Sequence, residues 1–224
     1  MKDIKAQKAG MLLQKLVSEG EHENQDFKFT VNDPRKIART VSAFANHSGG
    51  HLLIGVDDNG TVKGVRSEED IYVVEAAAQM YCEPPCPIEF TGYKAPGGAL
   101  VIRAEISPSH SRPVYVREED GKYKAYYRVS DENILAHPLM LRAWKYVDDP
   151  GSSLLFDVDS RHTSVLDVLK KQSLSPEDLA RRIELSRQSL RQIIVELYGM
   201  KLIDFVFRDR KFVLEIKSEN VKDN

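Results

Sequence analysis

Residues 26–64 read DFKFTVNDPRKIARTVSAFANHSGGHLLIGVDDNGTVKG, and this stretch decides the fold of the first part of the chain. It predicts a short strand, an amphipathic helix, a double-glycine turn and a hairpin. The helix starts at Asp33 and Pro34, because an aspartate side chain caps the first free N–H groups and proline has no N–H to leave unpaired. Its apolar residues Ile37, Val41 and Phe44 recur at helical spacing.

The double glycine Gly49–Gly50 separates this helix from a nearly continuous apolar run at residues 51–56, HLLIGV. Such a run predicts a central strand that is buried on both faces. The Asp-Asn-Gly sequence at residues 58–60 is typical of a hairpin turn.

Further elements surround this stretch. A helix is expected at Lys5–Ser18 and another at Ser67–Met80. Four strands are expected at Ile88–Tyr93, Leu100–Ile106, Val114–Glu118 and Tyr123–Val129. Helices interspersed with strands and hairpins indicate an α+β domain with a mixed sheet.

The composition sets the broad class of the protein. The chain has 224 residues, of which 42% are hydrophobic and 29% charged, as in globular proteins with one large or two modest domains. No apolar run approaches the roughly 20 residues that span a bilayer, and the first residues lack the core of a signal peptide. We therefore expect a cytoplasmic protein that does not bind a membrane.

A domain boundary is predicted at residues 147–162, VDDPGSSLLFDVDSRH, where Asp, Pro, Gly and Ser occur with little periodicity. The expected organisation is a first domain at 1–147, a linker at 148–162 and a second domain at 163–217. The second domain carries 11 Lys and Arg against 8 Asp and Glu, so it is mildly basic although the whole chain has a net charge of −2.

The second domain shows the element order of a winged helix. A helix is expected at Ser164–Lys171, a second after the capping serine Ser175, and a third between Ser186 and Gly199. Two strands, LIDFVF and KFVLEI, follow around a basic turn. Three helices followed by a hairpin form a winged helix-turn-helix domain.

In such domains the last helix enters the major groove and its first residues read base edges. Arg suits guanine, Gln suits adenine, and Ser can hold phosphate. The candidate contacts on this helix are Arg187, Gln188, Ser189, Arg191 and Gln192, and those of the hairpin are Arg208, Arg210 and Lys211. The alternative is a winged helix that dimerises or docks protein, with the same side chains facing solvent.

Several motifs of the first domain occur together: EGEHENQDFK at 19–28, VSAFANHSGG at 41–50, HLLIGVDDNGTVKG at 51–64 and YYRVSDENILA at 126–136. With these motifs, residues 19–146 resemble the AlbA-like domain of the Schlafen group, also classified as a divergent AAA domain. The resemblance implies an AlbA-like mixed-sheet fold. Many bacterial members pair this domain with a winged helix and are regarded as transcriptional regulators.

Animal members of the group include RNA-cleaving enzymes that use a cluster of carboxylates. The resemblance places that cluster on Glu21 and Asp26, with Asp57 or Asp58 as the third acid. This chain departs from the usual Glu-Phe-Lys, because Asp26 precedes Phe27 and Lys28. Its carboxylate is one methylene shorter, which changes any metal geometry.

A cleaving enzyme of this kind would need Mg²⁺ or Mn²⁺ on the carboxylates, with Lys28 and Arg128 holding the scissile phosphate. The alternative is that the loop acids face solvent and that Asp58 belongs to a turn that favours aspartate. DNA binding alone requires no cofactor. The chain lacks the Gly-Lys-Ser/Thr of a phosphate-binding loop, so the sequence does not support ATP binding.

The sequence thus predicts a nucleic-acid-binding protein, a DNA-binding transcriptional regulator that acts as a homodimer on duplex DNA, with RNA as the other target. The alternatives are a metal-dependent endoribonuclease and a non-catalytic interaction scaffold. The regulator is favoured over an enzyme.

Overall fold

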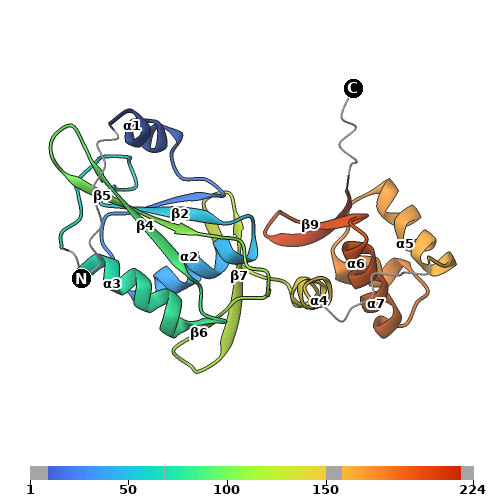
Figure 1. Cartoon of the computed structure of the whole chain (residues 1–224). Coiled ribbons are helices and arrows are strands. Elements are labelled where there is room, and N and C mark those ends of the chain that lie inside the picture. Colours follow the sequence, from blue (N-terminus) through green and yellow to red (C-terminus); the bar gives the residue numbers. More distant parts are fainter. Residues whose placement is uncertain (1–9, 68, 150–157, 218–224) are drawn as a thin grey trace. The chain divides into compact units, whose positions relative to one another are not determined.

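The computed structural model describes residues 10–67, 69–149 and 158–217 (Figure 1). The chain divides into two compact units, the N-terminal unit Met1–Ala136 and the C-terminal unit His137–Asn224. Each unit has its own sheet and helices.

The N-terminal unit combines helices with two four-stranded sheets, as the α+β prediction requires. Its elements are α1 (Gly10–Glu19), β1 (Gln25–Lys28), α2 (Pro34–Asn46), β2 (Gly50–Ile54), α3 (Glu69–Ala76), the π-helical turn η1 (Ala77–Tyr81), β3 (Cys82–Glu83), β4 (Ile88–Lys94), β5 (Leu100–Ile106), β6 (Tyr115–Arg117), β7 (Tyr123–Val129) and β8 (Glu132–Leu135).

The first sheet has the strand order β1-β2-β5-β4 and is mixed, because β1 and β2 run parallel while the other pairs are antiparallel. Strand β2 lies inside this sheet. Its residues Leu52, Leu53 and Ile54 are all fully buried, which confirms the prediction of a strand covered on both faces.

Helix α2 begins as expected, with the Asp33 side chain accepting hydrogen bonds from the backbone N–H groups of Arg35 and Lys36. The double glycine after it has a steric cause. Gly49 has a φ of +79°, and a Cβ on Gly50 would lie 2.6 Å from the ring of Phe44. Only glycines let β2 start this close to the helix.

The second sheet has the order β3-β6-β7-β8, and α2 packs against its strand β7 (Figure 1). Strands β3 and β8 were not predicted, because they span only two and four residues. Helix α2 is buried by contacts with both sheets, and its residues Ile37, Val41 and Phe44 belong to the main hydrophobic core.

Three local predictions differ in detail from the structure. The first described helix is Gly10–Glu19, and residues 5–9 of the predicted one lie outside the described residues. The helix expected at 67–80 begins at Glu69 and continues as η1. The turn at 58–60 exists, but only an isolated bridge between Val56 and Val62 flanks it.

The C-terminal unit contains four helices and a hairpin within the described residues. They are α4 (Pro138–Val147), α5 (Ser160–Lys171), α6 (Pro176–Arg182), α7 (Arg187–Gly199), β9 (Ile203–Arg208) and β10 (Lys211–Ile216). The order from α5 to β10 is the three-helix-plus-hairpin order that the sequence predicted.

Helix α4 corrects the domain boundary predicted at residue 147. It belongs to the C-terminal unit, where it packs against α7 and the indole Nε1 of Trp144 donates a hydrogen bond to the hydroxyl of Tyr198 at 3.2 Å. The sequence placed α4 in the first domain because the Pro-Gly-Ser segment follows it.

The linker expected at 148–162 also extends too far toward the C-terminus, because it includes the first residues of helix α5. Helix α5 begins at Ser160, because Asp159 and His162 form a reciprocal capping box there. Residues 150–157 lie outside the described residues. Ser175 and Ser186 cap α6 and α7 as predicted.

Among the described residues, no helix combines the length and the apolar character needed to cross a bilayer.

Candidate nucleic-acid interface

The first turns of α7 present polar side chains to solvent. Gln188, Arg191 and Gln192 are exposed, whereas Ser189 is half-buried. The Ser189 backbone N–H donates to the hydroxyl of Ser186 at 3.1 Å, and the two hydroxyl oxygens lie 2.8 Å apart. Ser189 therefore contributes to the helix cap, and the long side chains beside it are the groups that can reach a base.

The structure defines the surroundings of three long side chains at the start of α7. The Nε2 of Gln192 donates to the Oε1 of Glu196 at 2.8 Å, one helical turn further on. Arg187 and Arg191 line a pocket between α4, α6 and α7. No described residue pairs with the guanidinium of either arginine, so both remain available to an anion.

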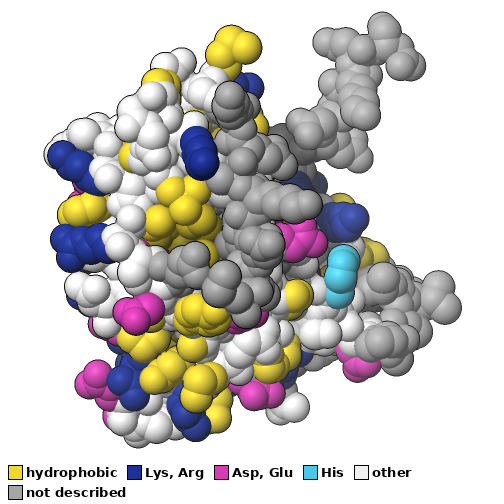
Figure 2. All heavy atoms as spheres, turned by 60° about the vertical axis from the view of Figure 1, so that its left-hand side comes forward, with side chains coloured by type: hydrophobic (Ala, Val, Ile, Leu, Met, Phe, Trp, Pro, Cys, Tyr) yellow, Lys and Arg dark blue, Asp and Glu magenta, His cyan; other side chains and the backbone are white. Residues whose placement is uncertain are grey.

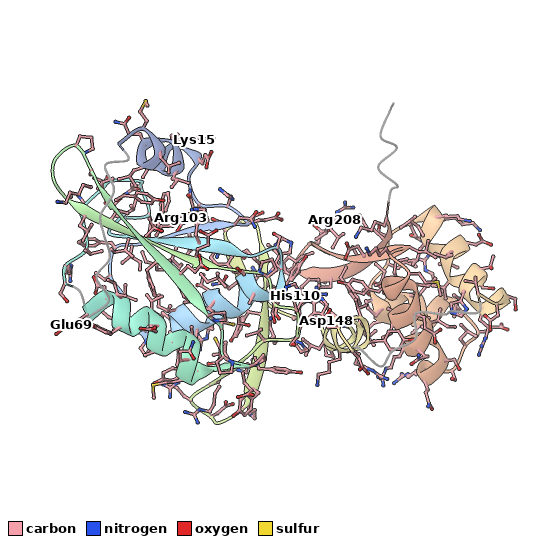
Figure 3. All side chains as sticks on the ribbon, viewed as in Figure 1. Lys15, Glu69, Arg103, His110, Asp148 and Arg208 are labelled. Carbon is pink, nitrogen blue, oxygen red and sulfur yellow. The ribbon has the colours of Figure 1, made fainter. Side chains whose placement is uncertain are left out.

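The β9–β10 hairpin carries the other predicted contacts. Arg208 pairs with Glu215 (Nη1–Oε1 2.5 Å), and Lys211 lies 3.5 Å from Asp178. Both side chains are still more than half exposed, and Arg208 extends from the end of β9 (Figure 3). Their charges are thus partly balanced within the unit.

Arg210 differs from its neighbours in the hairpin. It is exposed and no described residue pairs with it. Asp209 and Arg210 form the two-residue turn with φ values of +49° and +60°. Residues other than glycine are strained in this region by about 1 kcal/mol each. An unpaired arginine therefore occupies a position that glycine would fill with less strain.

Arg128 was predicted to hold a phosphate, and the structure contradicts this. The side chain is 1% exposed. Its guanidinium donates to Asp26 at 3.1 Å, to Asn133 at 2.9 Å and to the backbone carbonyl of Gln25 at 3.3 Å, and it lies over the ring of Phe44. Burial of Arg128 could not be predicted from the sequence, because β7 alternates between charged and aromatic residues. Arg128 stabilises the interior and is closed to nucleic acid.

Asp26 is the partner of two cations. Its Oδ1 faces Arg128, and its Oδ2 lies 2.5 Å from the Nζ of Lys28. Asp26 is 4% exposed. Asp26, predicted as a metal-binding acid, and Lys28, predicted as a phosphate contact, therefore form an ion pair with each other.

Glu21 lies next to this pair. Its Oε1 accepts a hydrogen bond from the backbone N–H of Phe27 at 2.8 Å. Burial, followed by the nearby Asp26 carboxylate, raises the pKa of Glu21. Two of the predicted carboxylates are thus close in space.

The third acid does not join them. Asp57 accepts hydrogen bonds from the backbone N–H groups of Asn59 and Thr61, so it shapes the turn, and Asp58 is an exposed residue of that turn. Within residues 10–67, 69–149 and 158–217, no three His, Cys, Asp or Glu side chains converge on a possible metal position. The donor set therefore does not fit the Mg²⁺ or Mn²⁺ site that the RNA-cleaving alternative requires.

A half-buried histidine predicts that the stability of the N-terminal unit decreases in acid. The Nε2 of His51 lies 2.8 Å from the Oε1 of Gln25. Burial, followed by the charge of Arg103 and by His22, lowers the pKa of His51 to about 4. The unfolded chain keeps the ordinary value near 6.5, so the unfolded state binds more protons between these values. The unfolding free energy should therefore fall as the pH decreases from about 6.5 to about 4.

The His51→Gln variant should lose this part of the pH dependence. Urea unfolding at several pH values, followed by hydrogen exchange in peptides of the N-terminal unit, measures it. The exposed His110 provides the control, because His110→Gln should leave the slope unchanged (Figure 3). A wild-type slope in His51→Gln would contradict the assignment.

The surface of the molecule shows no broad basic area in the view of Figure 2. There, Lys and Arg side chains lie scattered between hydrophobic and acidic ones. Exposed apolar side chains on the N-terminal unit include Met11, Tyr72 and Met80. Three basic side chains of the predicted interface, Arg187, Arg191 and Arg210, have no partner among the described residues, and all three lie in the C-terminal unit.

The sequence reasoning missed two residues of the pocket beside α7, Arg142 on α4 and Arg181 on α6. The sequence feature that could have identified Arg142 is the segment 138–147, PLMLRAWKYV, in which an arginine lies among apolar residues at helical spacing. Because the predicted domain boundary placed this segment in the first domain, Arg142 was not grouped with the residues of the winged helix.

The comparison with known proteins finds a different family model for each part of the chain. A family model described as TFIIE alpha subunit matches residues 155–219. No curated protein matches the chain significantly. Among solved structures, the DIP2311 protein from Corynebacterium diphtheriae is 17% identical with a TM-score of 0.43. The match covers 90% of this chain, which spans only 37% of the length of DIP2311.

A second solved structure, the N-terminal domain of a RecG-related protein from Nitrosomonas europaea, is 21% identical with a TM-score of 0.43. The match covers 59% of this chain and 96% of that domain. The family model described as Schlafen, AlbA_2 matches residues 21–137, which is more than half of the sequence. The chain therefore belongs to the Schlafen AlbA_2 family.

Proposed function

We propose that this protein binds duplex DNA through its C-terminal unit and acts as a cytoplasmic transcriptional regulator. The observation that carries the proposal is the exposed strip Gln188, Arg191 and Gln192 at the start of α7, the third helix of a winged-helix order. Side chains at this place enter the major groove in helix-turn-helix proteins. The matches to the Schlafen AlbA_2 and TFIIE alpha models support nucleic-acid binding.

The charges of the hairpin support a second contact. Arg210 has no described partner, and the strained turn holds its side chain in solvent. A phosphate contact at this place would fix the orientation of α7 without reading sequence. Because single winged helices bind weakly, the proposal includes a homodimer on paired half-sites.

The test measures the fluorescence anisotropy of mixed-sequence duplex DNA with the full chain. Arg191→Gln should weaken binding roughly tenfold, since a good contact to a base contributes about 1–3 kcal/mol. Arg210→Gly should keep the turn and weaken binding uniformly, with the salt slope reduced by about one phosphate. Lys94→Gln is the matched control, because it removes one exposed positive charge from the N-terminal unit.

Equal affinities for Arg191→Gln and Lys94→Gln would contradict the assignment of α7. Tighter binding of a folded RNA than of duplex DNA would contradict the choice of DNA.

A further inference from the structure

The pocket between α4, α6 and α7 has a composition that a DNA-contacting surface does not require. It has a volume of about 550 Å³, within the range of small-molecule sites. Four arginines line it, Arg142 from α4, Arg181 from α6, and Arg187 and Arg191 from α7. All residues that line it belong to the C-terminal unit.

Three of the four guanidinium groups have no partner in the protein. Arg181 pairs with Asp178 at 3.0 Å. No described residue forms an ion pair or hydrogen bond with the side chains of Arg142, Arg187 or Arg191. Like charges brought to one cavity repel each other, and an anion between them relieves that repulsion. A guanidinium group can also donate two parallel hydrogen bonds to a pair of oxygens of a carboxylate, sulfonate or phosphate group.

The remaining wall of the pocket is apolar except for His137 and Glu177, whose Nε2 and Oε1 lie 3.4 Å apart, so the one carboxylate of the lining has a partner of its own. Leu139, Leu190 and Ile194 are buried residues that line it. A free inorganic anion would leave this wall in contact with water. An organic anion with an aromatic or aliphatic body would cover the wall and place its charged group on the arginines. The two kinds of lining together specify an amphipathic ligand.

We propose that this pocket binds a small organic anion with an apolar body, and that the bound anion competes with DNA. Arg187 and Arg191 belong both to the pocket and to the proposed DNA-contacting turns of α7. An anion that holds them removes two cations from the DNA surface. The competition rests on the proposed function, whereas binding of the anion does not.

The probe is 8-anilinonaphthalene-1-sulfonate, which carries an aromatic body and one sulfonate. Titration into the full chain should give saturable fluorescence, including emission sensitised by Trp144, the single tryptophan of the chain, which lies on α4. Arg142→Gln should weaken the affinity about tenfold, because a charged hydrogen bond is lost. Arg182→Gln is the matched control, since this exposed arginine of α6 does not line the pocket.

Equal affinities of Arg142→Gln and Arg182→Gln for the probe would overturn the site. For the competition, a saturating concentration of the probe should weaken the affinity of the wild type for duplex DNA at least fivefold. At the same probe concentration, the DNA affinity of Arg142→Gln should decrease by a smaller factor. Unchanged DNA affinity at saturation would overturn the competition. Absence of DNA binding without any probe would refute the proposed function instead, and the probe titration would still decide the site.

Discussion

Replacing Arg128 by methionine is expected to destabilise the N-terminal unit by about 3–5 kcal/mol. The substitution removes the cation that faces Asp26 in the interior and leaves a carboxylate that is 4% exposed. Lys28 remains as a partner, but it is on one side of the carboxylate only. The substitution also removes one hydrogen bond each from the backbone carbonyl of Gln25 and from the Oδ1 of Asn133. Because domains are stable by roughly 5–15 kcal/mol, this is a large fraction of the total.

Urea unfolding of the full chain, followed by hydrogen exchange in peptides of each unit, measures the effect where it is expected. Trp144 fluorescence follows the C-terminal unit independently, because the single tryptophan lies there. Arg117→Met is the matched control, since Arg117 is exposed and no described residue pairs with it. Similar stability of the two variants would show that the Arg128 network contributes little.

A double variant separates the ion pair from other effects of the substitution. Asp26→Asn combined with Arg128→Met should be less destabilised than the sum of the single variants, because removing both charges leaves neither one buried alone. Strict additivity would mean that Asp26 and Arg128 act independently. The same series bears on the RNA-cleaving alternative, because loss of activity in an Asp26 variant would then reflect loss of the fold.

The parts of the fold that the sequence predicted are those with local causes. The caps at Asp33, Ser175 and Ser186 lie within three residues of the N–H groups they bind, so the signal is contained in a short window. The apolar run of β2 likewise implies burial on both faces without any knowledge of its neighbours.

The parts that were not predicted depend on partners far along the chain. Arg128 and Asp26 are 102 residues apart, and nothing in either segment identifies the other. Helix α4 was assigned to the wrong unit because its boundary was read from linker composition, whereas its attachment depends on the contact of Trp144 with Tyr198. On α7, position within a motif was enough to predict which side chains are exposed, whereas in the N-terminal unit the burial of Arg128 and Asp26 depends on distant partners.

The second large effect is expected at Asn46, which belongs to the AFAN motif and ends α2. Its side chain is fully buried. The Oδ1 accepts from the backbone N–H of Val114 at 2.7 Å, and the Nδ2 donates to the carbonyls of Val114 and Tyr126, both at 2.9 Å. One amide thus joins α2 to the backbone just before β6 and to β7.

Asn46→Leu is expected to destabilise the N-terminal unit by about 3–5 kcal/mol. The substitution keeps the branching at Cγ and the number of side-chain heavy atoms. The N–H of Val114 and the carbonyl of Tyr126 nevertheless lose their partners, and each unsatisfied buried group costs roughly 1–3 kcal/mol. The carbonyl of Val114 keeps the hydroxyl of Ser42 at 2.8 Å, so it adds less. Urea unfolding with hydrogen exchange measures the loss, which should be largest in peptides of β6 and β7.

Asn32→Leu is the matched control, because Asn32 is exposed just before α2 and no described residue binds its side chain. It should change stability by less than about 0.5 kcal/mol. Asn46→Asp tests the donor alone, since it keeps an acceptor for Val114 but turns a carboxylate toward two carbonyl oxygens. It should destabilise the unit at neutral pH as strongly as Asn46→Leu does. If Asn46→Asp instead retains wild-type stability, the Nδ2 hydrogen bonds do not hold the second sheet on α2, and apolar packing alone accounts for that contact.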